Sequence, residues 1–177
     1  MGDNGKPYST YTPELIRRMK ELVDAADVIT PNLTETCMLL GEECPPVMSV
    51  AQARSWLARL SDKPGIVVIK GVPLIDDDGQ KLSNVGFDKE SGSFWRIDWD
   101  HIPVHYPGTG DIFTSVLTAS LLKGESLPIA LNRATTFTEI AVKTTYSYGT
   151  EPRLGVLFED CLSWLMTNTV LCDYRKL

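Results

Sequence analysis

Apolar residues recur at helical spacing in the first third of the chain. Thr12-Pro13-Glu14 carries a helix start signal: an N-cap residue, a proline at the first helical position and an acid. The apolar positions that follow predict an amphipathic helix over residues 13–25. A second helix is predicted over residues 33–40, and Gly41 ends it. A third is predicted over residues 49–60, and Ser49 caps its start.

One apolar run lies between the first two of these helices and a second follows the third, and both predict strands. Residues 27–30 predict a short buried strand. Ile66-Val67-Val68-Ile69 is a continuous apolar run, which is typical of a strand covered on both faces in a parallel sheet. Because strands and helices alternate in this part of the chain, the pattern predicts βαβ units and an α/β fold.

The pattern changes after residue 72. Residues 81–87 and 94–98 predict the strands of a hairpin, and Asp76-Asp77-Asp78-Gly79 before them predicts a solvated turn. Helical spacing then returns in three predicted helices, over residues 111–123, 127–146 and 153–166.

The composition narrows the class of protein. The 177 residues are 43% apolar and 23% charged, without repeats or a clear linker, which predicts one folded domain over residues 1–177. A net charge of −6 with no basic stripe disfavours a nucleic-acid partner. No apolar run is long enough for a membrane span, and the start is not that of a signal peptide. The four cysteines show no metal-ligand spacing, so we expect reduced thiols in a cytoplasmic protein.

Pro107-Gly108-Thr109-Gly110-Asp111 is the strongest candidate for chemistry, because a helical run follows it directly. Two glycines around a small residue let the backbone turn its N–H groups to one side, and a helix start adds partial positive charge. Such amides suit an anion, and a neighbouring carboxylate suits the base of a phosphoryl transfer. For the tetrapeptide alone, a loop in which Asp111 only caps the helix is an equally good interpretation.

The pentapeptide, with the helix Asp-Ile-Phe-Thr-Ser after it, resembles the catalytic motif of the ribokinase superfamily in the form found in pyridoxal kinases. Three further segments resemble the same family in the same order: Met1-Gly2-Asp3, Thr30-Pro31-Asn32-Leu33-Thr34-Glu35 and Val67-Val68-Ile69-Lys70-Gly71. The resemblance implies a ribokinase-like three-layer α/β/α fold, with a mostly parallel sheet and a hairpin insertion. It also implies ATP as phosphoryl donor, Mg²⁺, and a monovalent cation near the phosphates.

The resemblance assigns roles to individual residues. Asp111 would be the catalytic base, and the amides of Gly108, Thr109 and Gly110 would form an anion hole. Asp3 and Glu35 would organise the metal. The expected ATP-binding residues are Thr30, Asn32, Lys70, Gly71, Ile102 and Val104.

Several of these assignments have plain alternatives. Asn32 and Glu35 also have the spacing of a simple capping arrangement, and Asp3 could be an exposed terminal residue. Lys70 stands where pyridoxal kinases commonly have a small hydroxyl residue, so phosphate contact and simple solvation are equally open. His101 and His105 match no catalytic position of the family.

The resemblance also implies an N-terminal half of the fold, which would precede residue 1 and supply the pocket for the vitamin ring. Met1 is either a native start or an internal methionine. Without that half, an exposed sheet edge favours a homodimer or another association. The predicted activity is ATP-dependent phosphorylation of the 5′-hydroxymethyl of pyridoxal, pyridoxine or pyridoxamine. The alternatives are a truncated, non-catalytic nucleotide-binding fragment and a kinase for another alcohol such as hydroxymethylpyrimidine, which Asp111 disfavours.

Overall fold

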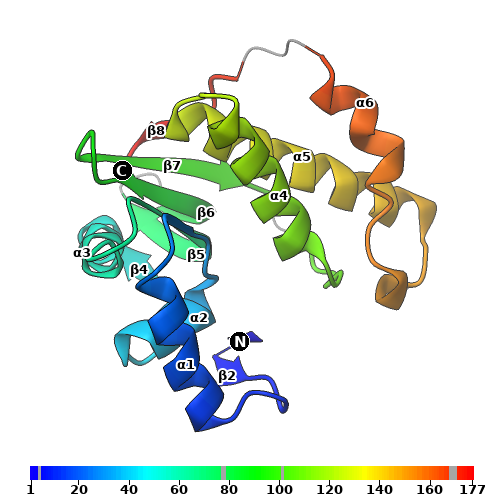
Figure 1. Cartoon of the computed structure of the whole chain (residues 1–177). Coiled ribbons are helices and arrows are strands. Elements are labelled where there is room, and N and C mark those ends of the chain that lie inside the picture. The colour runs from blue at the N-terminus through cyan, green and yellow to red at the C-terminus, as the bar shows by residue number, and fades with distance from the viewer. Residues whose placement is uncertain (4, 77–78, 101, 168–170) are drawn as a thin grey trace. The chain divides into compact units, whose positions relative to one another are not determined.

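The computed structural model describes residues 1–3, 5–76, 79–100, 102–167 and 171–177. Helices and strands alternate as expected of an α/β protein (Figure 1). The chain divides into two compact units, Met1–Arg96 with Lys176–Leu177, and Ile97–Arg175. A single domain over residues 1–177 therefore stays a prediction. Within the described ranges, no helix combines the length and the apolar character needed to cross a membrane.

The helices of the first unit begin and end close to their predicted limits. They are α1 (Pro13–Val23), α2 (Leu33–Leu40) and α3 (Val50–Leu60). Side-chain caps explain their starts, since Thr12 Oγ1 accepts the Leu15 N–H at 3.2 Å and Ser49 Oγ accepts the Gln52 N–H at 3.2 Å.

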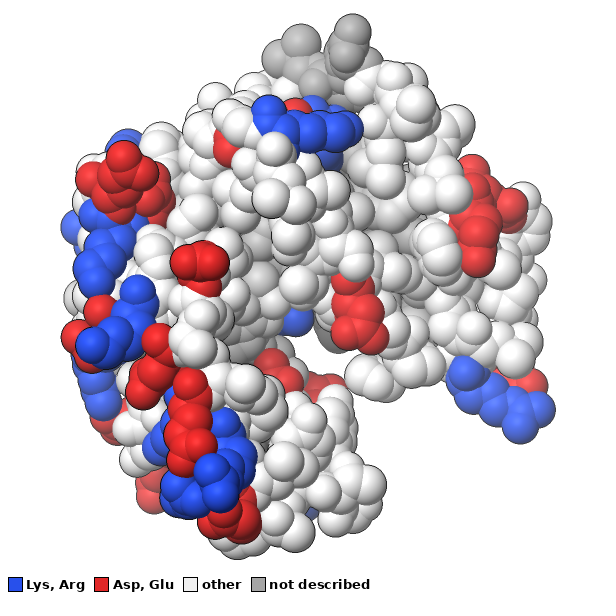
Figure 2. All heavy atoms as spheres, in the orientation of Figure 1, with Lys and Arg blue, Asp and Glu red and all other residues white. Residues whose placement is uncertain are grey.

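The first helix is less buried than its amphipathic pattern predicts. None of its residues is buried, and Leu22 is 62% exposed. Charges of both signs alternate along its exposed side, where Arg17 and Arg18 pair with Glu14 and Glu21 (Figure 2). An apolar face that its own unit leaves uncovered marks α1 as a place where further chain could pack.

The sheet is mixed. Its strands are β3 (Val28–Ile29), β4 (Met48–Ser49), β5 (Ile66–Asp76), β6 (Gly79–Asp88), β7 (Ser93–Trp99) and β8 (Arg175–Lys176), in the order β3-β5-β6-β7-β8 with β4 also on β5. Strands β3 and β4 pair with β5 in parallel, whereas β5 and β6 pair in antiparallel fashion. The predicted hairpin strands, residues 81–87 and 94–98, lie in β6 and β7, which are neighbours in the sheet. Two short strands, β1 (Gly2–Asp3) and β2 (Lys6–Pro7), form a separate antiparallel pair.

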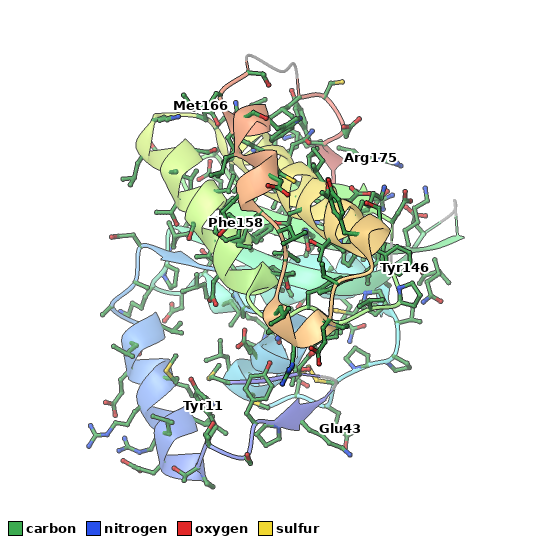
Figure 3. The ribbon with its side chains drawn as sticks, turned by 90° about the vertical axis from the view of Figure 1, so that its right-hand side faces the viewer. Tyr11, Glu43, Tyr146, Phe158, Met166 and Arg175 are labelled. Atoms are coloured by element: carbon green, nitrogen blue, oxygen red, sulfur yellow. A yellow bond between two sulfur atoms is a disulfide. The ribbon has the colours of Figure 1, made fainter. Side chains whose placement is uncertain are left out.

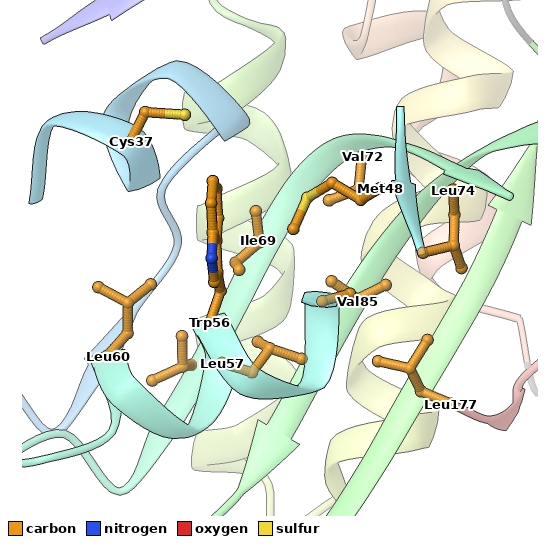
Figure 4. Close-up of a cluster of buried hydrophobic side chains, with 12 residues drawn as sticks. Cys37, Met48, Trp56, Leu57, Leu60, Ile69, Val72, Leu74, Val85 and Leu177 are labelled. Atoms are coloured by element: carbon orange, nitrogen blue, oxygen red, sulfur yellow. The ribbon is translucent and has the colours of Figure 1, made fainter. Parts of the chain in front are cut away.

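Strand β5 is longer than its apolar run, and the alternation of its buried side chains shifts by one residue midway. Val67 and Ile69 lie in the buried cluster of the first unit, and so do Val72 and Leu74 (Figure 4). Side chains alternate faces along a strand, so residues 69 and 72 share a face only because an extra residue lies between them. The register shift falls between these two residues.

The prediction that Asp76 is solvated is wrong. Asp76 is the last residue of β5, its side chain is 20% exposed, and it forms an ion pair with Arg96, whose side chain is 5% exposed. A buried guanidinium needs a charged partner, and the hairpin brings this carboxylate to it. Asp77 and Asp78 lie outside the described residues.

The expectation of four reduced thiols is also wrong. Cys37 of α2 and Cys44 form a disulfide, with their Cα atoms 5.6 Å apart, a usual separation for a disulfide. The helix ends at Gly41, whose φ of 72° turns the chain back so that Cys44 meets the helix. Cys161 and Cys172 are free.

In the second unit, two of the three predicted helices form. They are α4 (Thr109–Leu122) and α5 (Leu127–Tyr148). The continuous helix predicted over residues 153–166 is wrong, because Gly155 takes φ 80° and ψ −161°, a positive-φ conformation that favours glycine and interrupts the helix. The segment instead forms two 3₁₀ turns and a short helix: Pro152–Leu154, Glu159–Cys161 and α6 (Leu162–Leu165).

Candidate active site

Asn32 and Glu35 form a reciprocal cap at the start of α2. Asn32 Oδ1 accepts the Glu35 N–H at 2.8 Å, and Glu35 Oε2 accepts the Asn32 N–H at 2.9 Å. The capping arrangement considered from the sequence is therefore present. Asn32 does more than cap the helix, because its Nδ2 donates to the Gly2 carbonyl oxygen at 2.9 Å.

The N-terminal strand pair is fastened to the same helix start. The Gly5 N–H donates to Thr34 Oγ1 at 2.8 Å, and the Met1 amino group lies 2.7 Å from Glu35 Oε1. Gly2 has to be a glycine, since a Cβ there would lie 2.7 Å from the Met38 side chain and would clash with the Lys6 carbonyl. Asp3 is thereby held close to α2, and it is not a frayed terminal residue.

The two carboxylates make the potential around this helix start negative. Burial raises the pKa of the Tyr8 phenol above its ordinary value of 10.0, and the charges of Asp3 and Glu35 raise it further. Such a potential attracts a cation. Because Glu35 Oε2 accepts the Asn32 N–H, a cation that keeps its own waters, such as Mg²⁺, fits beside Glu35.

Lys70 and Gly71 lie beside the same segment. The Lys70 N–H donates to the Pro31 carbonyl oxygen at 2.9 Å, and the backbones of Lys70 and Asn32 form a parallel β-bridge. The Gly71 N–H donates to Asn84 Oδ1 at 3.0 Å. The first unit therefore brings together all six of its predicted site residues, which are Asp3, Thr30, Asn32, Glu35, Lys70 and Gly71.

In the second unit, the glycine-rich turn opens α4. Gly108 takes the left-handed conformation, with φ 86°, and no side chain caps the helix. The interpretation of Asp111 as only a helix cap is thus not supported. The N–H groups of Asp111 and Ile112 both donate to the Gly108 carbonyl oxygen, at 3.1 Å each. Within the described part of the chain, the N–H groups of Thr109 and Gly110 have no acceptor, so they are available to an anion.

Asp111 is exposed at the end of a groove of about 600 Å³ within the second unit. Ile112 and Val116 of α4 and Phe137 of α5 form part of its apolar lining. Phe158 and Met166, labelled in Figure 3, line it from the C-terminal segment. The paired side chains of Arg133 and Glu125 add charge to the wall.

A family model, described as phosphomethylpyrimidine kinase, matches residues 6–154, which include the start of α2, the Lys70–Gly71 segment and the start of α4, but neither the first strand nor the C-terminal segment of the groove. The chain belongs to the phosphomethylpyrimidine kinase family.

Solved structures and a curated relative agree with this membership. A crystal structure of a putative phosphomethylpyrimidine kinase from Bacteroides thetaiotaomicron, obtained with pyridoxal, is 39% identical with a TM-score of 0.92, and the match covers 100% of this chain and 62% of that one. Pyridoxal kinase from Lactobacillus plantarum is 28% identical with a TM-score of 0.80, over 94% of this chain and 58% of that one. These matches confirm the ribokinase-like α/β fold.

The curated hydroxymethylpyrimidine/phosphomethylpyrimidine kinase of Haemophilus influenzae is 30% identical over 130 residues. That match covers 73% of this chain but 48% of the relative. The chain thus spans about half the length of this curated relative, and about three fifths of the solved structures above.

Some features of this kinase-family site were not found from the sequence. Thr34 and Asn84 each hold a glycine N–H, and both are buried. In the sequence, Asn84 could have been noticed as a polar residue inside a segment whose apolar pattern predicts a strand. Ile102 and Val104 are half-buried and are not among the residues that line the groove beside Asp111, so their place in an adenine pocket stays a prediction. His101 lies outside the described residues.

Proposed function

We propose that this chain is the ATP-binding and phosphoryl-transferring part of a kinase that phosphorylates the 5′-hydroxymethyl of pyridoxal, pyridoxine or pyridoxamine. The observation that carries the proposal is the start of α4, where two N–H groups that have no acceptor among the described residues precede Asp111. Membership of a kinase family and the likeness to a pyridoxal kinase support it.

The amides of Gly108, Thr109 and Gly110 stabilise the negative charge that spreads over the transferred phosphoryl group. Asp111 orients the hydroxymethyl of the substrate and accepts its proton as the oxygen bonds to the γ-phosphorus and ADP leaves. Its exposure leaves the carboxylate open to an incoming alcohol.

Nucleotide binding is assigned to the first unit. Asn32, with Thr30, and the backbone at Lys70 and Gly71 face the phosphates of ATP in this proposal. Glu35 and Asp3 would hold Mg²⁺, which would supply positive charge to neutralise the phosphates. The pairing of Asn32 with Gly2, and of Lys70 with Pro31, supports this grouping.

A kinase for hydroxymethylpyrimidine is the second candidate. The matching family model and the relative from Haemophilus influenzae favour it. A nucleotide-binding fragment without turnover is the third, because about two fifths of each matched solved structure lies outside the match.

One set of assays distinguishes the three. ADP release from ATP is measured with pyridoxal, pyridoxine, pyridoxamine or hydroxymethylpyrimidine as acceptor, and ADP binding is measured by calorimetry. We expect ADP to bind and a B6 vitamer to be phosphorylated. Binding without turnover would favour the fragment, and turnover with the pyrimidine alone would favour the second candidate. Failure to bind ADP would reject all three.

A further inference from the structure

Strand β5 carries one extra residue opposite β6, next to the proposed phosphate site. Ile69 pairs with Val85 and Val72 pairs with Ser83, so Lys70 and Gly71 together face Asn84. Two residues opposite one form a β-bulge. Gly71 has φ 65°, and no atom lies within 4 Å of the position of a Cβ, so its left-handed conformation is what favours glycine.

The side chain of Asn84 holds the bulge. Its Oδ1 accepts the Gly71 N–H at 3.0 Å, in place of a backbone acceptor on β6. Asn84 is 6% exposed, and asparagine is disfavoured within strands. A buried polar side chain in a strand needs a partner, and the Gly71 N–H is one.

The bulge in turn is connected to the segment proposed to bind the nucleotide. The Lys70 N–H donates to the Pro31 carbonyl oxygen at 2.9 Å, and the backbones of Lys70 and Asn32 form a parallel β-bridge. Hydrogen bonds therefore run from Asn84 through the bulge to the start of α2. A shift of the bulge would move the backbone at Lys70 and Gly71 relative to Asn32.

We propose that Asn84 is a positioning residue for nucleotide binding: it fixes the Lys70–Gly71 bulge so that this backbone meets the phosphates together with Asn32. This inference rests on the proposed function. Asn84 itself lies in β6 and acts through Gly71.

The first test measures the hydrogen bond without any ligand. In the full chain, Asn84→Ala removes the acceptor, whereas Asn84→Asp keeps an acceptor oxygen. Hydrogen exchange of the Gly71 amide, followed by NMR, should become about tenfold faster in Asn84→Ala and stay slow in Asn84→Asp. Unchanged exchange in Asn84→Ala would overturn the proposal.

The second test separates positioning from stability. Val85→Ala serves as the matched control, because Val85 is fully buried beside Asn84 and pairs with Ile69 but does not contact the Gly71 amide by its side chain. We expect Asn84→Ala to weaken binding of ADP with Mg²⁺ about tenfold or more, and Val85→Ala to change it by no more than about twofold at a similar loss of stability. Equal losses in the two variants would overturn the proposal.

If the unsubstituted chain binds no ADP, the proposed function fails and the positioning role fails with it. The exchange measurement would still report whether Asn84 holds the bulge. Failure of this inference alone has a different signature, in which the unsubstituted chain binds ADP and Asn84→Ala binds it equally well.

Discussion

Asn32 and Gly2 are joined by a hydrogen bond from the Asn32 Nδ2 to the Gly2 carbonyl, 2.9 Å long, across 30 positions of sequence. The same Asn32 side chain accepts the Glu35 N–H with its Oδ1. One amide group thus caps α2 and fastens the N-terminal strand pair to it. This double use explains why two motifs far apart in the sequence share one place in the first unit.

Replacing Asn32 should cost more than the loss of a helix cap. A cap contributes about 1 kcal/mol, and a second hydrogen bond adds about 0.5–1.5 kcal/mol. We expect Asn32→Ala to lower the free energy of unfolding, measured in urea, by about 1.5–2.5 kcal/mol. Ser49→Ala, which removes only a cap, is the control and should lose about 1 kcal/mol. Equal losses in the two variants would mean that the Gly2 contact contributes nothing.

Asp111→Asn should affect turnover and leave nucleotide binding nearly unchanged. Removal of a general base lowers kcat by about 10²–10⁴-fold, whereas the affinity for ADP should stay the same. Steady-state kinetics with a B6 vitamer and calorimetry with ADP measure the two effects. Thr118→Ala, two turns further along α4, exposed and not among the residues that line the groove, is the control and should keep its rate. An unaltered kcat in Asp111→Asn would remove this carboxylate from the mechanism.

The Cys37–Cys44 disulfide should stabilise the chain under oxidising conditions. Closing a loop of this length restricts the unfolded chain and contributes about 2.5 kcal/mol. Cys44→Ser should therefore unfold at lower urea concentration than the unsubstituted chain, and a reducing agent should abolish the difference. Cys172→Ser, at an exposed free cysteine, should have no effect. Persistence of the difference under reduction would show that Cys44 acts by packing.

Acid should weaken the ion pair between Glu125 and Arg133. Hydrogen bonds from Arg133 hold the pKa of Glu125 below its ordinary value of 4.5, with charges on Arg133 and Lys123 adding to the effect. A carboxyl whose pKa is lowered by folding stabilises the protein above its unfolded pKa, and this contribution is lost as the pH falls through the folded pKa.

We therefore expect stability to fall below about pH 4.5, by about 0.5–1 kcal/mol from this pair. Urea unfolding of the unsubstituted chain and of Glu125→Gln between pH 7 and pH 3 measures the effect. The difference between the two should shrink as the pH falls. A difference that is constant over this range would show that the charge of Glu125 does not contribute.

Local signals in the sequence were sufficient for much of the fold. Thr12, Asn32 and Ser49 start their helices, and Gly41 ends one, because a cap or a left-handed residue acts within a few positions of itself. The turn at Gly108 was likewise recognisable, since its dihedral angles and the helix start after it are local properties.

Contacts between distant segments overruled the sequence pattern at other places. Asp76 looked like part of a solvated turn, but the hairpin places it against the buried Arg96. The helical spacing of residues 153–166 continues across Gly155, which nevertheless adopts a positive-φ conformation outside the helical region. The spacing of apolar residues predicts neither outcome, because each depends on which other segments of the folded chain lie nearby.

The sequence by itself determined the α/β class, the helix caps and the glycine-rich start of α4 with Asp111 behind it. Only the tertiary structure decided that Asn32 reaches Gly2, that Asn84 holds the bulge at Gly71, and that Cys44 meets Cys37. The reason is physical: caps and turns are set by the dihedral angles of neighbouring residues, whereas a bulge or a cross-strand contact depends on the register and folding of segments that are far apart in the chain.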